Sequence, residues 1–519
     1  MRPALRLALA AFPAAALLML PHHPVGFVAP PTLPVELLLL LPALLALGRV
    51  GTELAALAAL ALSLIAALKL LDIAAFSAFA RRFDPAVDLS LIASGWTLLS
   101  GSIGRAGAGL AAGGLILGLL AAGGLAFLGL RVWARAGARL SALPRLAAGA
   151  VALAAGLVVL PEHPGFTTRL AADHLADYRR SRAALAEFAA AAQGDPWRDR
   201  PGAMGALGGR DVAVVFVESY GRAAFDNPAY AARHRATLTE GARALAASGL
   251  AIRSGWLTAP IEGGQSWLAH ATLAAGLTVG DQNRYGAVLA SPRLTLYDIA
   301  ARAGYRTLAV APAIVLPWPE AANLGFQTVL AAADLGYRGQ PFDWVTMPDQ
   351  YTLHAFDRLA PRDAPLMTEI ALISSHAPWT PLPRPVPWDA VGDGRLFDAM
   401  TREGPSPQAL WRDRDRVRHQ FGLALDYAVT TVLDWAALPR DMPPLLVVLG
   451  DHQPAGFVAR TGGADVPVHL IGPPEVLALF DGWGWTPGPE PAPDLPPWPM
   501  AAFRDRFLEA TVLRAEEGL

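Results

Sequence analysis

The sequence predicts two structural parts: a polytopic α-helical membrane domain, followed by an α/β domain with a mostly parallel sheet sandwiched by helices. Three observations lead to this prediction. The chain has 519 residues, which is too long for one ordinary domain. Hydrophobic residues make up 53% of it and charged residues only 17%, which excludes a disordered chain and indicates a membrane-embedded part. Long apolar runs fill the first third, whereas strand and helix patterns alternate after it.

The charges are divided unevenly along the chain. Residues 1–160 carry 11 basic and 5 acidic side chains, whereas the rest carries 31 basic and 39 acidic ones. An acidic soluble part has no electrostatic surface for nucleic acid, so we exclude that partner. The chain has no cysteine, which excludes disulfides, thiolate metal ligands and a cysteine nucleophile.

The membrane domain, placed at residues 1–161, is predicted from five successive apolar runs. These are residues 4–20, 33–47, 54–71, 109–130 and 146–160. Each approaches the ~20 residues that cross a bilayer, although the second and the fifth are short. The soluble alternative is a buried helical core, which the scarcity of charges in all five runs disfavours. The first run alone also resembles a signal peptide, but no convincing cleavage site follows it.

The arginines set the orientation of the predicted spans. With the N-terminus in the cytoplasm, the inside segments contain Arg2, Arg6, Arg49, Arg131, Arg135, Arg139 and Arg145. The outside segments contain only Arg81, Arg82 and Arg105, with Lys69 close to that face. This bias predicts that the region after residue 160 lies outside the cytoplasm. We therefore expect a multi-pass protein of a bacterial inner membrane whose C-terminal domain faces the periplasm or the exterior.

Two segments flank the spans and are less regular. Residues 88–104 are apolar but short and rich in Ser and Gly, and we interpret them as an interfacial or re-entrant segment. As a sixth span they would move the C-terminal domain to the cytoplasm. Residues 162–210 form a linker, in which the helical pattern at 174–192 suits either a helix on the membrane surface or a plain connecting helix.

Residues 211–519 alternate between strand and helix patterns. The expected strands are residues 211–217, 305–311, 369–373, 444–449 and 466–471, and the expected helices are 229–248, 294–303 and 412–437. This alternation predicts a mostly parallel sheet with helices on both faces. In such sheets, ligands bind beyond the carboxyl ends of the strands.

Polar side chains follow three of these strands. Glu218 follows the first, His376 comes after the third, and Asp451 and His452 follow the fourth. Carboxylate and imidazole groups without thiolates are ligands for zinc, manganese or magnesium. Taken singly, each acid has a structural role as its alternative to metal binding. Glu218 could lie beside a helix N-cap, and Asp451 could cap a turn. Together, at one predicted sheet edge, they indicate a metal site.

A candidate nucleophile lies between the first two predicted strands. Ser266 follows Gly263, Gly264 and Gln265 and precedes a helix-like segment. At a helix N-terminus, backbone N–H groups and the helix dipole attract negative charge, which favours an activated hydroxyl. An ordinary serine N-cap is the alternative.

These motifs resemble the alkaline phosphatase superfamily, in the branch of sulfatases, lipoteichoic acid synthases and phosphoethanolamine transferases. The segment SWLAHATLAAG is similar to the sulfatase signature, with Ser266 at the nucleophile and Gly276 at the closing glycine. In VFVESYGR and GDHQP, the residues that match the family's metal ligands are Glu218, Asp451 and His452. His376, in SSHAPW, resembles the substrate-side histidine, and the five predicted spans resemble those of the lipoteichoic acid synthases.

The sequence also departs from the sulfatase signature. Leu268 and His270 replace the proline and arginine that direct formylglycine formation, so we do not expect that modification. A free Ser266 hydroxyl favours phosphoryl transfer through a phospho-serine. The first strand is followed by one acidic ligand instead of paired aspartates, which favours a single ion.

The resemblance implies a mechanism. One divalent ion, zinc or manganese with magnesium possible, is held by Glu218, Asp451, His452 and the Ser266 oxygen. Ser266 attacks the phosphorus of a membrane lipid donor, and His376 stabilises the transferring group or protonates the leaving oxygen.

A glycan or lipid acceptor of the envelope then takes the phosphoglycerol or phosphoethanolamine group. Weaker candidates for substrate contacts are Arg222, His270 and Trp318. Instead of contacting substrate, Arg222 could form an ion pair on the surface, and His270 could have a structural role. Two other functions stay open: a membrane-anchored sulfatase or phosphodiesterase that uses water as acceptor, and a non-catalytic envelope scaffold.

Overall fold

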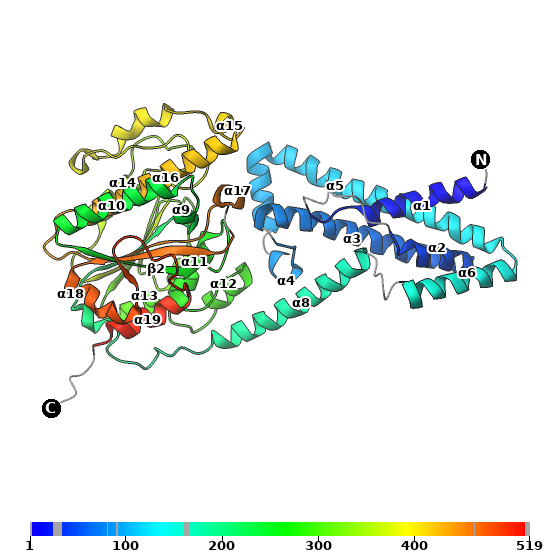
Figure 1. Cartoon of the computed structure of the whole chain (residues 1–519), viewed down its shortest axis with the longest axis horizontal. Helices are drawn as coiled ribbons and strands as arrows, with labels where there is room; N and C mark the ends of the chain where they lie inside the picture. Colours follow the sequence, from blue (N-terminus) through cyan, green and yellow to red (C-terminus); the bar gives the residue numbers. More distant parts are fainter. Residues whose placement is uncertain are drawn as a thin grey trace. The chain divides into compact units, whose positions relative to one another are not determined.

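The structure is a computed structural model, and it describes residues 3–23, 34–79, 81–89, 92–159, 166–460 and 462–513. The chain divides into two compact units, Met1–Ala186 and Glu187–Leu519 (Figure 1). Some predicted features fall outside the described residues: Arg2, residue 33 at the start of the second run, residues 90–91 of the predicted re-entrant segment, and residues 160–165 around the predicted start of the linker.

The first unit consists of helices. Its main elements are α1 (Pro3–Met19), α2 (Leu37–Leu47), α3 (Gly51–Phe79), α5 (Ile92–Ala138), α6 (Ala142–Ala154), which continues into the π-helical turn η3 (Ala155–Val159), and the first part of α8 (Phe166–Ala191). Within the described residues, two segments are long and apolar enough to cross a bilayer, Gly51–Ser77 and Ile103–Ala138. The segments Pro3–Met19, Leu37–Leu47 and Ala142–Val158 are apolar but shorter. The five-span arrangement therefore stays a prediction.

Gly104 interrupts the helix α5. Its backbone angles, φ 76° and ψ 158°, are not helical, so the chain kinks there. The described part of the predicted re-entrant segment beyond Ile92 is therefore helical up to this kink, and the long apolar segment follows it.

The ionisable residues near the end of α3 are buried but have partners. The ammonium group of Lys69 donates to the carbonyl oxygen of Leu18 (2.7 Å) and to the hydroxyl of Thr167 (3.1 Å). Asp72 Oδ2 lies 3.0 Å from His174 Nε2. These contacts satisfy groups that would otherwise be costly in an apolar environment, and they join α8 to α3.

The second unit is built around one mixed sheet. Its strands are β1 (Val212–Val217), β2 (Ala251–Thr258), β3 (Arg306–Ala311), β4 (Thr328–Ala331), β5 (Leu366–Leu372), β6 (Leu445–Gly450), β7 (Asp465–Gly472), β8 (Thr486–Pro487) and β9 (Trp498–Pro499). The order is β4-β3-β5-β1-β6-β7-β2-β8, and β9 pairs with β2. The strands from β4 to β6 are parallel, whereas β7 runs antiparallel to both of its neighbours.

The parallel strands β4 to β6 confirm the expected mostly parallel sheet, whereas the antiparallel direction of β7 was not predicted. The connection from β6 to β7 contains, among its described residues, only the four-residue helix α17 (Gly456–Ala459), whereas a parallel return needs a longer crossover. β2 was not predicted, because Arg253, Ser254 and Gly255 interrupt its apolar pattern.

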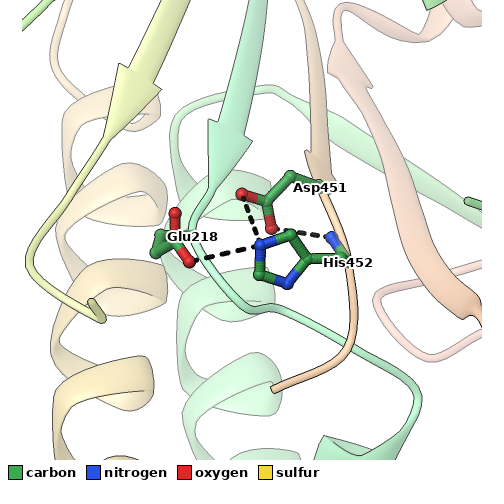
Figure 2. Close-up of side chains that lie close together, drawn as sticks. All are labelled: Glu218, Asp451 and His452. Atoms are coloured by element: carbon green, nitrogen blue, oxygen red, sulfur yellow. Dashed lines mark hydrogen bonds and ion pairs between the residues drawn. The ribbon is translucent and has the colours of Figure 1, made fainter. Parts of the chain in front are cut away.

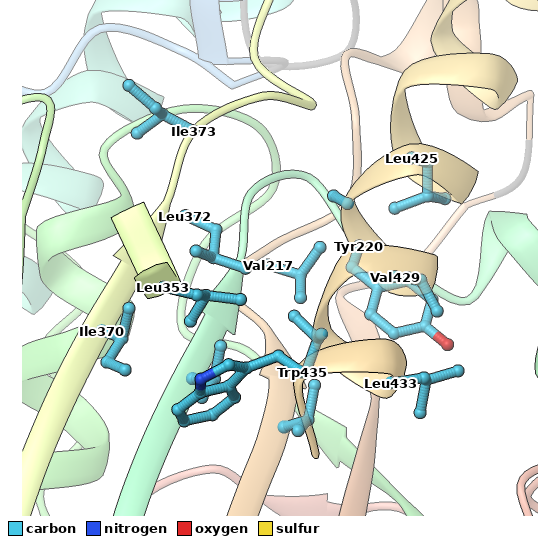
Figure 3. Close-up of a cluster of buried hydrophobic side chains, with 14 of the residues drawn as sticks. Val217, Tyr220, Leu353, Ile370, Leu372, Ile373, Leu425, Val429, Leu433 and Trp435 are labelled. Atoms are coloured by element: carbon cyan, nitrogen blue, oxygen red, sulfur yellow. The ribbon is translucent and has the colours of Figure 1, made fainter. Parts of the chain in front are cut away.

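Helices cover both faces of the sheet (Figure 1). The predicted helices are confirmed as α10 (Ala231–Ala247), α13 (Leu296–Arg302) and α16 (Arg414–Ala436). One core joins Val215 and Val217 of β1 to α10, α14 (Asp349–Leu359) and α16, and Figure 3 shows part of it around Val217, Leu353 and Trp435. The other core joins Val214 and Phe216 to α11 (Ser266–Ala275), α13 and α19 (Ala502–Thr511). Successive residues of β1 thus enter opposite cores.

Candidate metal-binding active site

The carboxyl ends of three neighbouring strands place the predicted site residues at one edge of the sheet. Val217, the last residue of β1, pairs with Leu372 of β5 on one side and with Gly450 of β6 on the other. Glu218 directly follows Val217, and Asp451 directly follows Gly450. His376 lies four residues beyond the end of β5. The parallel register therefore brings groups from distant parts of the sequence to the same edge.

Glu218, Asp451 and His452 form a compact cluster (Figure 2). Each offers one ligand atom, and these atoms all lie within 4.8 Å of one another. His452 Nε2 is 3.5 Å from Glu218 Oε1 and 3.7 Å from Asp451 Oδ2. All three side chains are buried. Two buried carboxylates this close repel each other unless a positive charge lies between them, so the arrangement suits a cation.

Backbone groups hold the cluster in place. Asp451 Oδ1 accepts hydrogen bonds from the backbone N–H of Ser219 (2.8 Å) and of His452 (2.7 Å). The ring nitrogen His452 Nδ1 lies 2.7 Å from the carbonyl oxygen of Gln453, which can only accept, so Nδ1 carries the proton. This tautomer leaves the lone pair of Nε2 directed at the two carboxylates, as a metal ligand requires.

Ser266, the first residue of α11, also lies at this cluster. Its hydroxyl donates to Glu218 Oε2 (3.1 Å) and lies 3.2 Å from His452 Nε2. The three preceding residues, Gly263, Gly264 and Gln265, all have positive φ angles between 62° and 68°. This left-handed turn brings the chain to the cluster and starts the ten-residue helix there, so the helix N-terminus faces the same point as the two acids.

The acids of the cluster have shifted pKa values. Burial, with a smaller effect from the nearby Glu218 carboxylate, raises the pKa of Asp451 to about 6. Burial acts in the same direction on Glu218, but His452, His376 and the hydrogen bond from Ser219 together lower the pKa of Glu218 below its usual value. Glu218 therefore stays ionised, and the donor set of two carboxylates, one imidazole and one hydroxyl fits zinc, manganese or magnesium.

Residues 210–466 match the family model described as Sulfatase. The C-terminal domain is an α/β domain of the sulfatase type. This match, which covers the sheet edge with all four clustered residues, confirms the superfamily that the sequence motifs predicted. A search of curated proteins found no match to the chain.

Several solved structures are similar to part of the chain at low sequence identity. One is the lipoteichoic acid synthase LtaP from Listeria monocytogenes (12% identity, 51% of this chain and 65% of that chain, TM-score 0.34). Another is the periplasmic domain of EptC from Escherichia coli in complex with Zn (14%, 59% and 84%, 0.36). A third is the phosphoglycerol transferase GacH from Streptococcus pyogenes with sn-glycerol-1-phosphate (12%, 55% and 72%, 0.35). The match thus spans less than two thirds of LtaP, and the assignment of the family rests on the Sulfatase match.

His376 lies at the same edge of the sulfatase domain. It is close enough to Glu218 to contribute to lowering the pKa of that acid. Its ring stacks on the half-exposed Trp344, with centroids 3.9 Å apart, and its Nδ1 lies 2.7 Å from the carbonyl oxygen of Ala377. The imidazole is therefore held in one orientation at the rim of the site.

Two of the weaker candidates make their contacts elsewhere. Arg222 forms ion pairs with Asp226 (3.0 Å) and Asp465 (3.4 Å), as its surface alternative predicted, and lies over the ring of Trp256. Trp318 packs against Phe326 at the edge of the second core. No recorded contact of either side chain involves the cluster within the described residues.

His270 has partners that sequence reasoning missed. Its Nδ1 lies 2.8 Å from Glu369 Oε1, and the hydroxyl of Tyr297 donates to Glu369 Oε2 (2.6 Å). Burial by itself lowers the pKa of His270, but Glu369 outweighs this effect and raises the pKa above the usual value. The available signal was a lone acid inside an otherwise apolar strand, LMTEIAL.

Proposed function

We propose that the sulfatase domain is a metal-dependent transferase that moves a phospho-alcohol group through a covalent intermediate on Ser266. The donor is a membrane lipid such as phosphatidylglycerol or phosphatidylethanolamine, and the acceptor is a hydroxyl of an envelope glycan or lipid. One observation carries the proposal: the Ser266 hydroxyl lies within hydrogen-bond distance of both Glu218 and His452, at a helix N-terminus.

The residues of the cluster would hold one divalent ion. Its ligands would be Glu218, Asp451, His452 Nε2 and the Ser266 oxygen, and the bound ion would supply Lewis-acid stabilisation of negative charge on oxygen. Independently of the ion, the hydrogen bond from Ser266 to Glu218 orients the hydroxyl and gives its proton an acceptor.

The reaction proceeds by two displacements at phosphorus. In the first, a bond forms between Ser266 Oγ and phosphorus, the bond from phosphorus to the lipid glycerol oxygen breaks, and that oxygen takes up a proton to leave as an alcohol. In the second, a bond forms between the acceptor oxygen and the same phosphorus, the bond from phosphorus to Ser266 Oγ breaks, and the proton that the acceptor hydroxyl loses balances the one that Ser266 Oγ regains. The stacking of Trp344 on His376 supports a role for His376 in donating the proton to the leaving oxygen or in binding the transferring group.

The lipid donor is supported by the first unit. Its two long apolar segments, Gly51–Ser77 and Ile103–Ala138, would keep the sulfatase domain at a bilayer surface. Together with the arginine bias, they support an inner-membrane enzyme whose catalytic domain faces the periplasm or the exterior.

A second candidate function is hydrolysis. The match to the Sulfatase family favours a membrane-anchored sulfatase or phosphodiesterase in which water resolves the intermediate. The same cluster serves both reactions, because only the acceptor differs.

The purified full chain, loaded with zinc or manganese, tests these functions. It is incubated with vesicles that contain headgroup-labelled phosphatidylglycerol or phosphatidylethanolamine, with and without envelope glycan, and in parallel with an aryl sulfate. Transfer predicts diacylglycerol release and label on the glycan. Label released only as the free phospho-alcohol, or turnover of the sulfate ester alone, would replace the transferase by the hydrolase. No turnover of any substrate and no stoichiometric metal would favour the scaffold.

A further inference from the structure

A third buried acid lies on the sheet face that carries Glu218. In the β1–β5 ladder, Glu369 pairs with Val214, and alternate residues of β1 lead from Val214 through Phe216 to Glu218 on the same face. Glu369 is only 5% exposed, and its two carboxylate oxygens are engaged separately, one by Tyr297 and one by His270. Glu369, Tyr297 and His270 thus form a hydrogen-bonded group, the brace, in which a buried strand carboxylate fixes a histidine of the helix that begins at Ser266.

His270 lies one helical turn after Ser266 in α11. Helical side chains lean toward the N-terminus of their helix, so the imidazole leans toward the turn that carries Ser266. On its other side the ring stacks on Phe216, with centroids 3.8 Å apart and planes at 11°. Phe216 and Glu369 together leave the ring one orientation.

The remaining ring nitrogen of His270 is available to a ligand. Nδ1 is taken by Glu369, and within the described residues the structure records no hydrogen bond to Nε2. The His270 side chain is 15% exposed, whereas its helix neighbours Leu268, Ala269 and Ala271 are fully buried. Among the described residues, Nε2 is therefore the one side-chain polar atom of Glu369, Tyr297 and His270 without a recorded protein partner.

We propose that Glu369 and Tyr297 are positioning residues that orient His270, so that its Nε2–H binds a non-bridging oxygen of the group carried by Ser266. This inference rests on the proposed function, because it needs a tetrahedral oxyanion at Ser266. A phosphodiester group on Ser266 has two non-bridging oxygens. One faces the cluster of Glu218, Asp451 and His452, and the other needs a donor on the helix side. A carboxylate-braced imidazole supplies a charge-assisted donor there.

Conservative variants separate this role from simple packing. Glu369→Gln keeps the side-chain size but removes the charge, and Tyr297→Phe removes one oxygen atom. The matched controls are Thr368→Val, on the same strand, and Tyr305→Phe, in the same core, because the hydroxyl oxygens of Thr368 and Tyr305 are buried without a hydrogen-bond partner. His270→Ala removes the donor itself.

Two measurements on the metal-loaded full chain test the proposal. Titration calorimetry with inorganic phosphate measures oxyanion affinity without turnover, and kinetics with the lipid or sulfate substrate that the wild type turns over separates kcat from KM. We expect His270→Ala to weaken phosphate binding and to lower kcat by about 10²-fold, the cost of losing one oxyanion donor. We expect Glu369→Gln and Tyr297→Phe to lower the phosphate affinity and kcat by about tenfold each, with little change in KM. The controls Thr368→Val and Tyr305→Phe should match the wild type.

The outcomes that overturn the inference are distinct from those that overturn the proposed function. If Glu369→Gln, Tyr297→Phe and His270→Ala lower only the melting temperature and leave phosphate affinity and kcat unchanged, the brace is structural and the inference is wrong. If Ser266→Ala turns over substrate normally, the covalent mechanism is wrong, and the phosphate titration still decides whether His270 binds an oxyanion.

Discussion

Glu218 and Asp451 occupy equivalent positions beyond two paired strands: each follows directly after one member of the Val217–Gly450 pair. The carboxylate of Asp451 also accepts the backbone N–H of Ser219, so the two strand ends are locked to each other. Since a one-residue slip in register would turn one of these acids to the opposite face of the sheet, the pairing of β1 with β6 decides whether the cluster exists.

The Ser266 hydroxyl carries the proposed chemistry. We expect Ser266→Ala to reduce turnover by at least about 10³-fold while the melting temperature stays close to that of the wild type. Among the described residues, the Ser266 hydroxyl is the one recorded within hydrogen-bond distance of both Glu218 and His452, whereas the Ser219 hydroxyl contacts Glu218 alone. The control is Ser291→Ala, whose hydroxyl donates to the carbonyl oxygen of Val288 and accepts from the backbone N–H of Arg293, with no recorded contact to the cluster within the described residues. Steady-state kinetics and thermal unfolding check both variants. Turnover by Ser266→Ala at the wild-type rate would contradict the serine mechanism.

The cluster should bind one divalent ion for each chain. We expect Asp451→Ala and Glu218→Ala to lose that ion, because either change leaves the remaining ligands too few and unbalanced in charge. Elemental analysis of the purified proteins measures this, with Asp363→Ala as the control, since Asp363 forms only an exposed pair with Arg306. Chelation should lower the melting temperature of the wild type, because an ion that binds the folded state stabilises it. A full complement of metal in Asp451→Ala would remove Asp451 from the ligand set.

His469 should make the sulfatase domain sensitive to acid. Burial, with a smaller effect from His234, lowers the pKa of His469 to about 3, and its ring nitrogens face the hydroxyls of Tyr220 and Ser254. The unfolded chain binds a proton near pH 6.5 and the folded chain does not, so stability is full above that pH and falls as the pH decreases toward 3. At pH 5 the loss from this residue is about 2 kcal/mol.

Thermal or denaturant unfolding between pH 5 and 8 measures this effect. His469→Gln should lower the free energy of unfolding at pH 8. It should also reduce the loss of that free energy between pH 8 and pH 5 by about 2 kcal/mol. A variant with the slope of the wild type would show that other groups control the acid sensitivity.

The absence of cysteine allows a direct test of topology. We expect a single cysteine at the exposed Glu240 of the sulfatase domain to react with a membrane-impermeant maleimide in intact cells. A single cysteine at the exposed Ser141, which lies between α5 and α6 and close in sequence to Arg139 and Arg145, should react only after the cells are permeabilised. Reaction at Ser141 but not at Glu240 in intact cells would place the sulfatase domain in the cytoplasm.

Much of the site could be predicted because its residues follow local patterns. The apolar run before Glu218 and the run before Asp451 identify strands buried on both faces, and parallel strands that alternate with helices end at one edge. The glycines before Ser266 likewise identify a turn into a helix. Each of these signals lies within a few residues of the side chain that it predicts.

Other features depend on contacts between distant segments, and no local pattern carries them. The antiparallel direction of β7 and the strand β2 follow from how the chain returns to the sheet, and the ion pairs of Arg222 with Asp226 and Asp465 follow from which loops meet around it. The partnership of Glu369, Tyr297 and His270 arises only when β5, α13 and α11 pack on one sheet face.

The sequence by itself therefore determined the apolar helical part and the α/β part, the strand ends and the identity of the candidate ligands, because hydrophobic periodicity and turn residues act locally. The tertiary structure alone decided which polar groups share a position, because hydrogen bonds and ion pairs form between whichever side chains the packed sheet and helices bring within about 3 Å.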